Sequence, residues 1–197
     1  EAKLYVDPTV KPVAQMNRRV PFHLQPALEK ELKQMIADDI IEPVKGPASW
    51  VSPLVIVSKP KQPGKIRVVL DSRAVNSSIL RQHSPVKTLD DIIHQLNGSS
   101  VYSKLDLRSA FEKIQLHKDS RPYTAFSSHI GRFMFKRLCY GLNVSSEIFQ
   151  TALSQVLNGI PGVIQIAVDC LIYGATVAEH DATLHAVVNR LLEHGLT

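Results

Sequence analysis

The sequence predicts an α+β fold in which a mostly antiparallel sheet packs against helices on one face and a small hairpin lobe projects from it. Three observations predict this class. Apolar residues recur with helical period in several segments, short apolar runs of strand length lie between them, and the 197 residues contain no internal repeat. At roughly 150 residues per domain, this length makes one domain or two small lobes that share a core.

The first half of the chain indicates an arm, a helix and a strand pair. Four prolines in the first 26 residues, with the pair Arg18 and Arg19, favour an extended arm. Leu28, Leu32, Met35 and Ile36 then follow at i, i+4, i+7 and i+8, the apolar stripe of a helix. The next β-rich runs are residues 50–57 and 66–70, joined by a Pro- and Gly-containing loop that carries Lys59, Lys61 and Lys65.

The second half alternates helices and strands in the same way. A strand at 101–105 should deliver the carboxylate of Asp106 to its end, and Asp169 interrupts two short apolar strands. The other expected elements are helices at 88–98, 145–157 and 178–194, a helical turn at 108–113, and strands at 124–126, 132–136, 163–168 and 170–173.

Composition narrows the class of protein. The formal net charge is +5, which suits a polyanionic partner, and no apolar run approaches the roughly 18 residues that a membrane helix needs. The two cysteines, Cys139 and Cys170, lie far apart without metal-ligand spacing, so neither a zinc site nor a disulfide framework is expected. We expect a soluble, intracellular chain of the nucleus or cytoplasm, cut from a longer protein.

Five blocks of the sequence resemble the motifs of reverse transcriptases from gypsy-type LTR retrotransposons and retroviruses. The resemblance covers nearly the whole chain. The blocks are Ile41-Glu42-Pro43 with Trp50-Val51-Ser52-Pro53, the run from Ile66 to Asn76, the run from Ser103 to Phe111, Thr124-Ala125-Phe126, and Phe135 to Leu142 continuing to Phe149-Gln150, with Glu179-His180-Asp181 closing the pattern.

The resemblance implies a fold and a division of the chain. Residues 1–85 are expected to form an N-terminal arm and fingers, and residues 86–197 a palm with an antiparallel sheet and packed helices. Parts of the two are interleaved, and no thumb or RNase H segment is expected within the chain.

The same resemblance implies roles for particular residues. Asp106 and Asp169 are the expected catalytic and metal-binding carboxylates, with Mg²⁺ or Mn²⁺ as the ion of an active enzyme. Arg73 and Gly141 are the expected contacts to an RNA or DNA primer-template. The expected contacts to an incoming deoxynucleotide are Lys59, Lys61, Lys65, Arg67, Phe111 and Gln150.

One departure from the family pattern decides the expected function. The palm hairpin of the family carries two adjacent aspartates, whereas this chain has Val168 and then Asp169 in that place. A register shifted by one would pair Asp169 with Cys170 instead, so either register loses one carboxylate. Because valine offers no lone pair to a metal ion, we expect an inactive domain, with no metal bound, that keeps the fold and nucleic-acid binding.

Two rival functions stay open at this stage. One is a working RNA-directed DNA polymerase in which Asp106 and Asp169 suffice. The other is a protein-interaction module, a homodimer or a complex with another protein, that reuses the fold. Without the resemblance, Asp106 is typical of a helix cap, Asp169 of a turn, Phe111 of a core aromatic, and His180 and His185 of surface or packing residues.

Overall fold

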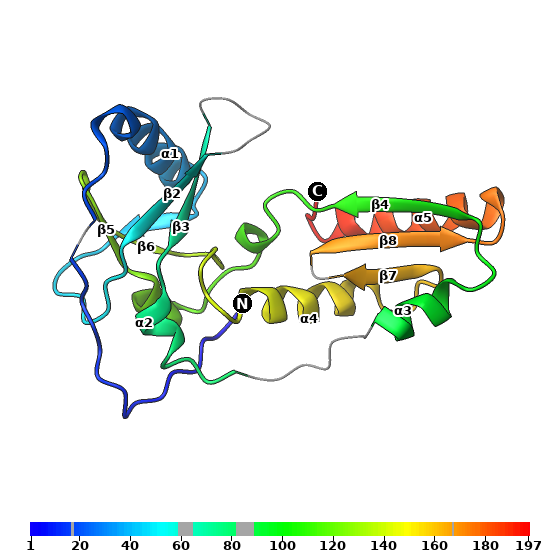
Figure 1. The fold of residues 1–197 in the computed structure, drawn as a ribbon, viewed down its shortest axis with the longest axis horizontal. Coiled ribbons are helices and arrows are strands. Elements are labelled where there is room, and N and C mark those ends of the chain that lie inside the picture. The colour runs from blue at the N-terminus through cyan, green and yellow to red at the C-terminus, as the bar shows by residue number, and fades with distance from the viewer. Residues whose placement is uncertain (17, 59–64, 82–88, 167) are drawn as a thin grey trace. The chain divides into compact units, whose positions relative to one another are not determined.

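The computed structural model describes residues 1–16, 18–58, 65–81, 89–166 and 168–197, and Figure 1 shows their helices and strands. Two compact units are present. Unit 1 comprises Glu1–Arg81 and Ile114–Ser145, and unit 2 comprises Gln82–Lys113 and Ser146–Thr197. All strand pairs in both units are antiparallel and helices pack beside them, so the predicted α+β class is confirmed.

Unit 1 holds two small sheets. One is three-stranded with the order β1-β6-β5, and the other is the hairpin of β2 and β3. Its strands are β1 (Ile41–Pro43), β2 (Leu54–Ser58), β3 (Ile66–Leu70), β5 (Phe126–Ser128) and β6 (Gly131–Phe135), and its helices are α1 (Gln25–Ala37), α2 (Arg73–Asn76) and 3-10 turns at Phe22–Leu24 and Lys118–Thr124.

The core of unit 1 follows the predicted apolar stripe of α1. Leu28, Leu32 and Met35 are buried, and α1 packs against β1 and β3. Ile36 differs from the prediction because its side chain is 40% exposed. It lies eight residues beyond Leu28 and is therefore rotated about 80° around the helix axis, beyond the buried edge of the stripe.

The N-terminal segment is extended, as predicted, but its backbone is paired rather than solvated. The Ala2 amide donates to the Gln115 carbonyl at 2.7 Å, and the His117 amide donates to the Ala2 carbonyl at 2.8 Å. The buried Leu4 amide donates to the Ser120 hydroxyl at 2.8 Å. These bonds attach the arm to the loop and the 3-10 turn that precede β5.

Unit 2 is a three-stranded sheet with helices. The strand order is β4-β8-β7, with β8 in the middle, and α5 packs against β8 and β4. Its elements are α3 (Leu89–Leu96), β4 (Val101–Asp106), a 3-10 turn at Phe111–Lys113, α4 (Ser145–Leu157, beginning at the boundary), β7 (Val163–Ile166), β8 (Asp169–Gly174) and α5 (Val177–Glu193).

Several predicted boundaries are corrected by the structure. The strand expected from Trp50 begins only at Leu54, after Pro53, which lacks the amide proton that a ladder needs. Of the helical turn expected at 108–113, only Phe111–Lys113 form a 3-10 turn, and Ser109 before it has a positive φ of 51°. Thr124 ends the 3-10 turn at Lys118–Thr124, and the strand after it begins at Phe126.

The pair of β7 and β8 also differs from the prediction at Asp169. This residue is the first of β8 and does not interrupt the strands, because the turn falls before it and includes Val168. The two histidines of α5 differ in burial, since His180 is buried and His185 is exposed.

None of the described helices is long and apolar enough to cross a membrane.

Candidate active site

The two predicted catalytic carboxylates meet in the sheet of unit 2. Asp106 is the last residue of β4 and Asp169 the first of β8, and the two are direct partners in the antiparallel ladder. Side chains alternate along a strand, so the outward face of β4 carries Tyr102, Lys104 and Asp106, all of them exposed. Asp169, opposite Asp106, lies on the same face.

A lysine contacts one of these two carboxylates. The Lys104 ammonium lies 2.7 Å from Asp169 Oδ2, and the exposed fractions of the two side chains are 65% and 26%. The hydrogen bond to Asp169 raises the pKa of Lys104 above its ordinary value, and the nearby negative charges of Asp169 and Asp106 add to this effect. Lys104 was not among the site residues predicted from the sequence, although its position two residues before Asp106 places it on the same strand face.

The donor set around the turn does not fit a two-ion centre. Mg²⁺ and Mn²⁺ prefer several hard oxygen ligands, and the position before Asp169 is occupied by the half-buried Val168. Within the described ranges, no three His, Cys, Asp or Glu side chains are grouped so that they could hold a metal ion. The second residue of the strand after the turn is the buried Cys170, and burial, with the charge of Asp169, raises the pKa of its thiol to about 11.

Two further predicted site residues lie in unit 2. The Phe111 ring packs edge-on against Phe149 of α4, with ring centroids 6.0 Å apart and an interplanar angle of 78°. Both rings are buried, which agrees with the interpretation of Phe111 as a core aromatic. Gln150 follows on α4, and its backbone carbonyl accepts a hydrogen bond from Gln165 Nε2 at 3.1 Å.

The predicted nucleotide and nucleic-acid residues of unit 1 that the structure describes lie in β3, in α2 or in the segments beside them. Arg67 is exposed on β3, and its guanidinium carbon lies 4.7 Å from the centroid of the Tyr140 ring, a cation–π contact. Lys65 is exposed just before β3. Lys59 and Lys61 lie outside the described residues. The Tyr140 contact was not predicted, since no sequence period links a strand residue to a loop about 70 residues later.

Asp71 forms ion pairs with two arginines of unit 1. Arg73 donates to it twice, from Nε to Oδ1 and from Nη2 to Oδ2, both at 2.8 Å, and Arg18 of the arm also forms an ion pair with Oδ2. The hydrogen bond from Arg73 lowers the pKa of Asp71, and the positive charges of Arg73 and Arg18 contribute. Asp71 therefore orients Arg73, which remains 80% exposed.

Gly141 lies against the end of β3 and is hydrogen-bonded to α2. Its φ is +110°, and a side chain at this position would overlap the backbone carbonyl of Leu70. Asn76 Nδ2 donates to the Gly141 carbonyl at 2.8 Å, and the Leu70 amide donates to the Tyr140 carbonyl at 3.2 Å. The turn at Gly141 is thus hydrogen-bonded to the end of the hairpin that carries Arg67.

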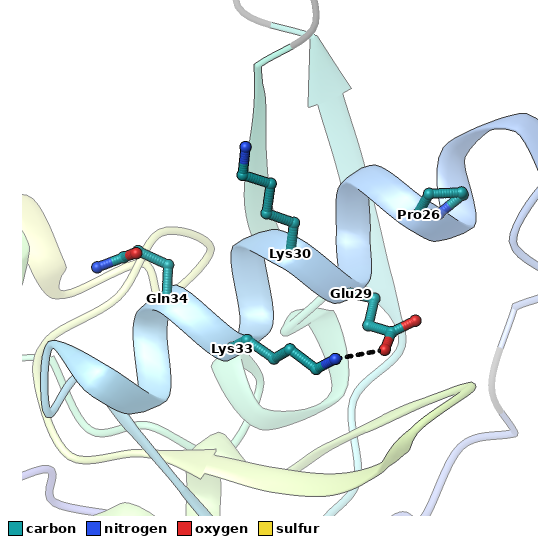
Figure 2. Close-up of a pocket in the computed structure, with 5 residues that line it drawn as sticks. All are labelled: Pro26, Glu29, Lys30, Lys33 and Gln34. Atoms are coloured by element: carbon teal, nitrogen blue, oxygen red, sulfur yellow. Dashed lines mark ion pairs between the residues drawn. The ribbon is translucent and has the colours of Figure 1, made fainter.

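A surface hollow on α1 has none of the predicted site residues in its lining. It is lined by Pro26, Glu29, Lys30, Lys33 and Gln34, all from this helix (Figure 2). Lys33 forms an i,i+4 ion pair with Glu29 at 2.7 Å, and Figure 2 shows Lys30 pointing away from that pair. This hollow brings no catalytic group together.

Comparison with known proteins now identifies the class. A sequence model of the reverse transcriptase (RNA-dependent DNA polymerase) family matches residues 57–197. The chain is 34% identical over 154 residues to the retrovirus-related Pol polyprotein of transposon 412 and 31% identical over 173 residues to that of transposon gypsy, both from Drosophila melanogaster. These matches cover 76% and 84% of this chain but only 12% and 16% of the polyproteins.

The fold comparison agrees. The structure of a foamy viral protease-reverse transcriptase in complex with double-stranded DNA has a TM-score of 0.83 and 28% identity, covering 95% of this chain and 32% of that one. A second foamy virus structure has a TM-score of 0.85 at 23% identity, which shows likeness of fold. The chain therefore belongs to the reverse transcriptase family. It is a reverse-transcriptase-like domain of the kind found in the Pol polyproteins of retroelements.

Proposed function

We propose that this chain is a catalytically silent reverse-transcriptase domain, from a decayed or host-captured retroelement, that retains binding to a primer-template. The observation that carries the proposal is Val168, which stands before Asp169 where the family pattern has the first of two adjacent aspartates. A two-ion mechanism of nucleotidyl transfer needs carboxylates at both places. The Lys104 ammonium on Asp169 supports the same conclusion, because a cation of the chain already forms an ion pair with the carboxylate that the hairpin retains.

The proposed loss of activity is large. Removing one ligand that costs about 4 kcal/mol of transition-state stabilisation lowers the rate roughly a thousandfold, since each 1.36 kcal/mol is tenfold. Asp106 and Asp169 are proposed as the remnant of the catalytic pair. Lys59, Lys61, Lys65, Arg67, Phe111 and Gln150 are proposed as the remnant of the deoxynucleotide site.

Nucleic-acid binding is proposed from the retained basic surface. Arg67 and Arg73 are both exposed and held by neighbouring groups, and the chain has a formal net charge of +5. The foamy viral relative of similar fold is described in complex with double-stranded DNA. We propose that residues 1–85 act as arm and fingers and residues 86–197 as palm, with Arg73 and Gly141 facing the primer-template.

The test is primer extension on an RNA template with deoxynucleotides and Mg²⁺ or Mn²⁺. The native chain is compared with Val168→Asp, and Val177→Asp serves as the matched control because Val177 is 63% exposed on α5, away from the carboxylate pair. Extension by Val168→Asp alone is the expected result. Extension by the native chain would overturn the proposal and favour a working polymerase that uses Asp106 and Asp169.

A binding assay separates the remaining alternative. The native chain should bind a primer-template duplex with an affinity that falls steeply with salt, because neutralised phosphates release counterions. A chain that neither extends nor binds the duplex would contradict the proposal and favour a protein-interaction module.

A further inference from the structure

Three charged side chains share one face of the palm sheet. Lys104 and Asp106 are two residues apart on β4, and Asp169 is the ladder partner of Asp106 on β8. Lys104 is the ladder partner of Leu171, so it reaches Asp169 diagonally across the pair of strands. Long side chains make such diagonal contacts readily. The arrangement brings one ammonium and two carboxylates to the end of the hairpin.

Two directly opposed carboxylates on neighbouring strands repel each other and need a cation nearby. The formal charge of the two carboxylates is −2, and the ammonium at 2.7 Å from Asp169 reduces the charge of the cluster to −1. A divalent ion would meet the same carboxylates as its ligands. The ammonium on Asp169 therefore supplies positive charge that a bound metal ion would otherwise supply.

We infer that Lys104 is an internal counter-ion of the palm carboxylates, whose ammonium takes the place of a divalent cation on Asp169 and weakens metal binding at the Asp106–Asp169 pair. The inference rests on the proposed function in one respect, since it takes residue 168 to supply no carboxylate. It adds a residue and a cause: metal binding at the palm is weakened by a cation of its own as well as by a missing ligand.

The physical argument is one of competition for the same oxygens. A divalent ion that approached Asp169 would have to displace the ammonium from Oδ2 or share the carboxylate with it at short range, where like charges repel. In the part of the chain that the structure describes, no third His, Cys, Asp or Glu side chain is grouped with the two carboxylates to offset that repulsion. The described neighbours of Asp169 in the chain are Val168, whose side chain has no metal-binding atom, and Cys170, whose thiol is buried.

An ordinary surface ion pair is the alternative explanation, because exposed Lys–Asp pairs generally contribute little. The two explanations differ in what happens when the ammonium is removed. If Lys104 is a counter-ion, a neutral side chain at this position uncovers a site for a divalent cation. If the pair is incidental, metal binding does not depend on the residue.

The experiment is a Mn²⁺ titration of the chain followed by electron paramagnetic resonance of the free ion, which requires no catalysis. Lys104→Met should bind one Mn²⁺ about tenfold more tightly than the native chain, equivalent to about 1.4 kcal/mol. Lys104→Arg, which keeps the charge, should behave as the native chain does. Lys113→Met is the matched control, since it removes an exposed lysine of unit 2 from the end of a 3-10 turn.

Further variants decide the outcome. Lys104→Met combined with Asp169→Asn should lose the gained Mn²⁺ site, and Lys104→Gln repeats the test with a polar neutral side chain whose folding is checked by circular dichroism. Equal Mn²⁺ affinity of the native chain and both neutral variants overturns the inference, as does a gain that survives Asp169→Asn. Primer extension by the native chain would overturn the proposed function instead, so the two failures are distinguishable.

Discussion

The backbone carbonyl of Leu70 fills the space in which a side chain on Gly141 would begin. Leu70 is the last residue of β3, and its amide donates to the carbonyl of Tyr140, the residue before Gly141. Two segments far apart in the sequence therefore touch through their backbones at this point. The contact holds Tyr140 beside Arg67, so the geometry of the proposed nucleotide-binding surface depends on a residue without a side chain.

Gly141→Ala should destabilise unit 1 by about 2–5 kcal/mol, because it adds a backbone clash to the strain of a positive φ. The measurement is urea unfolding followed by the fluorescence of Trp50, the single tryptophan, which is buried in unit 1. Gly46→Ala is the control. Its φ is +93° with no atom within 4 Å of the added carbon, so about 1–2 kcal/mol is expected. Equal losses would contradict the clash.

His180 should matter for the stability of unit 2, whereas His185 should not. The His180 ring is buried, and its nitrogens lie 2.9 Å from the Ser103 hydroxyl on β4 and 2.9 Å from Asp181 Oδ1. His180→Ala leaves the Ser103 hydroxyl without this partner and should cost about 1–3 kcal/mol. The measurement is pulsed thiol labelling of Cys170 in increasing urea, read by mass spectrometry. His185→Ala, at an exposed position on the same helix, should leave the free energy of unfolding within about 0.5 kcal/mol of native.

Much of the fold could be predicted from the sequence because its elements carry strong periodic patterns. The stripe of Leu28, Leu32 and Met35 indicated α1, and the apolar run before Asp106 indicated β4, with only small boundary errors. The 3-10 turn that ends at Thr124 and the positive φ of Ser109 carry no such pattern. They are set by tertiary contacts, such as the Thr124 hydroxyl that accepts from the Phe135 amide at 2.9 Å.

The candidate site was predictable only as far as its motifs reach. Resemblance to the family indicated Asp106, Asp169 and the substitution at Val168 without any coordinates. Lys104 was missed because its role depends on the register between β4 and β8, which places it diagonally across from Asp169. Asp71 was missed as well, although it binds Arg73, because a short-range ion pair leaves no period in the sequence.

The Asp71 ion pairs should make the stability of unit 1 depend on acid pH. Because the folded pKa of Asp71 is lowered from 3.8, chiefly by the hydrogen bond from Arg73, its contribution is fully present above that value and is lost as the pH falls below it. Asp71→Asn should therefore be less stable than native at pH 6, and the difference should shrink toward pH 3. Trp50 fluorescence in urea across this range provides the measurement. Asp38→Asn, at an exposed carboxylate after α1, is the control; a constant gap for Asp71→Asn would contradict the linkage.

Arg73 should contribute one phosphate contact to a bound primer-template. Its guanidinium is oriented by Asp71 and 80% exposed, so its remaining donors can reach a phosphate. Arg73→Gln should weaken duplex binding and make the plot of log affinity against log salt less steep by about 1, as expected for one lost contact. Fluorescence anisotropy of a labelled primer-template between low and moderate salt, at pH 7, measures this slope for the native chain and for Arg73→Gln.

The matched control for Arg73 is Lys118→Gln, which removes an equal charge from an exposed position in the 3-10 turn before β5. If binding depends on Arg73 in particular, the slope for Lys118→Gln should stay near that of the native chain. Equal changes in both variants would mean that only net charge matters, because long-range attraction does not distinguish the two positions. An unchanged slope for Arg73→Gln would instead remove Arg73 from the proposed nucleic-acid surface while leaving the other basic residues of unit 1 as candidates.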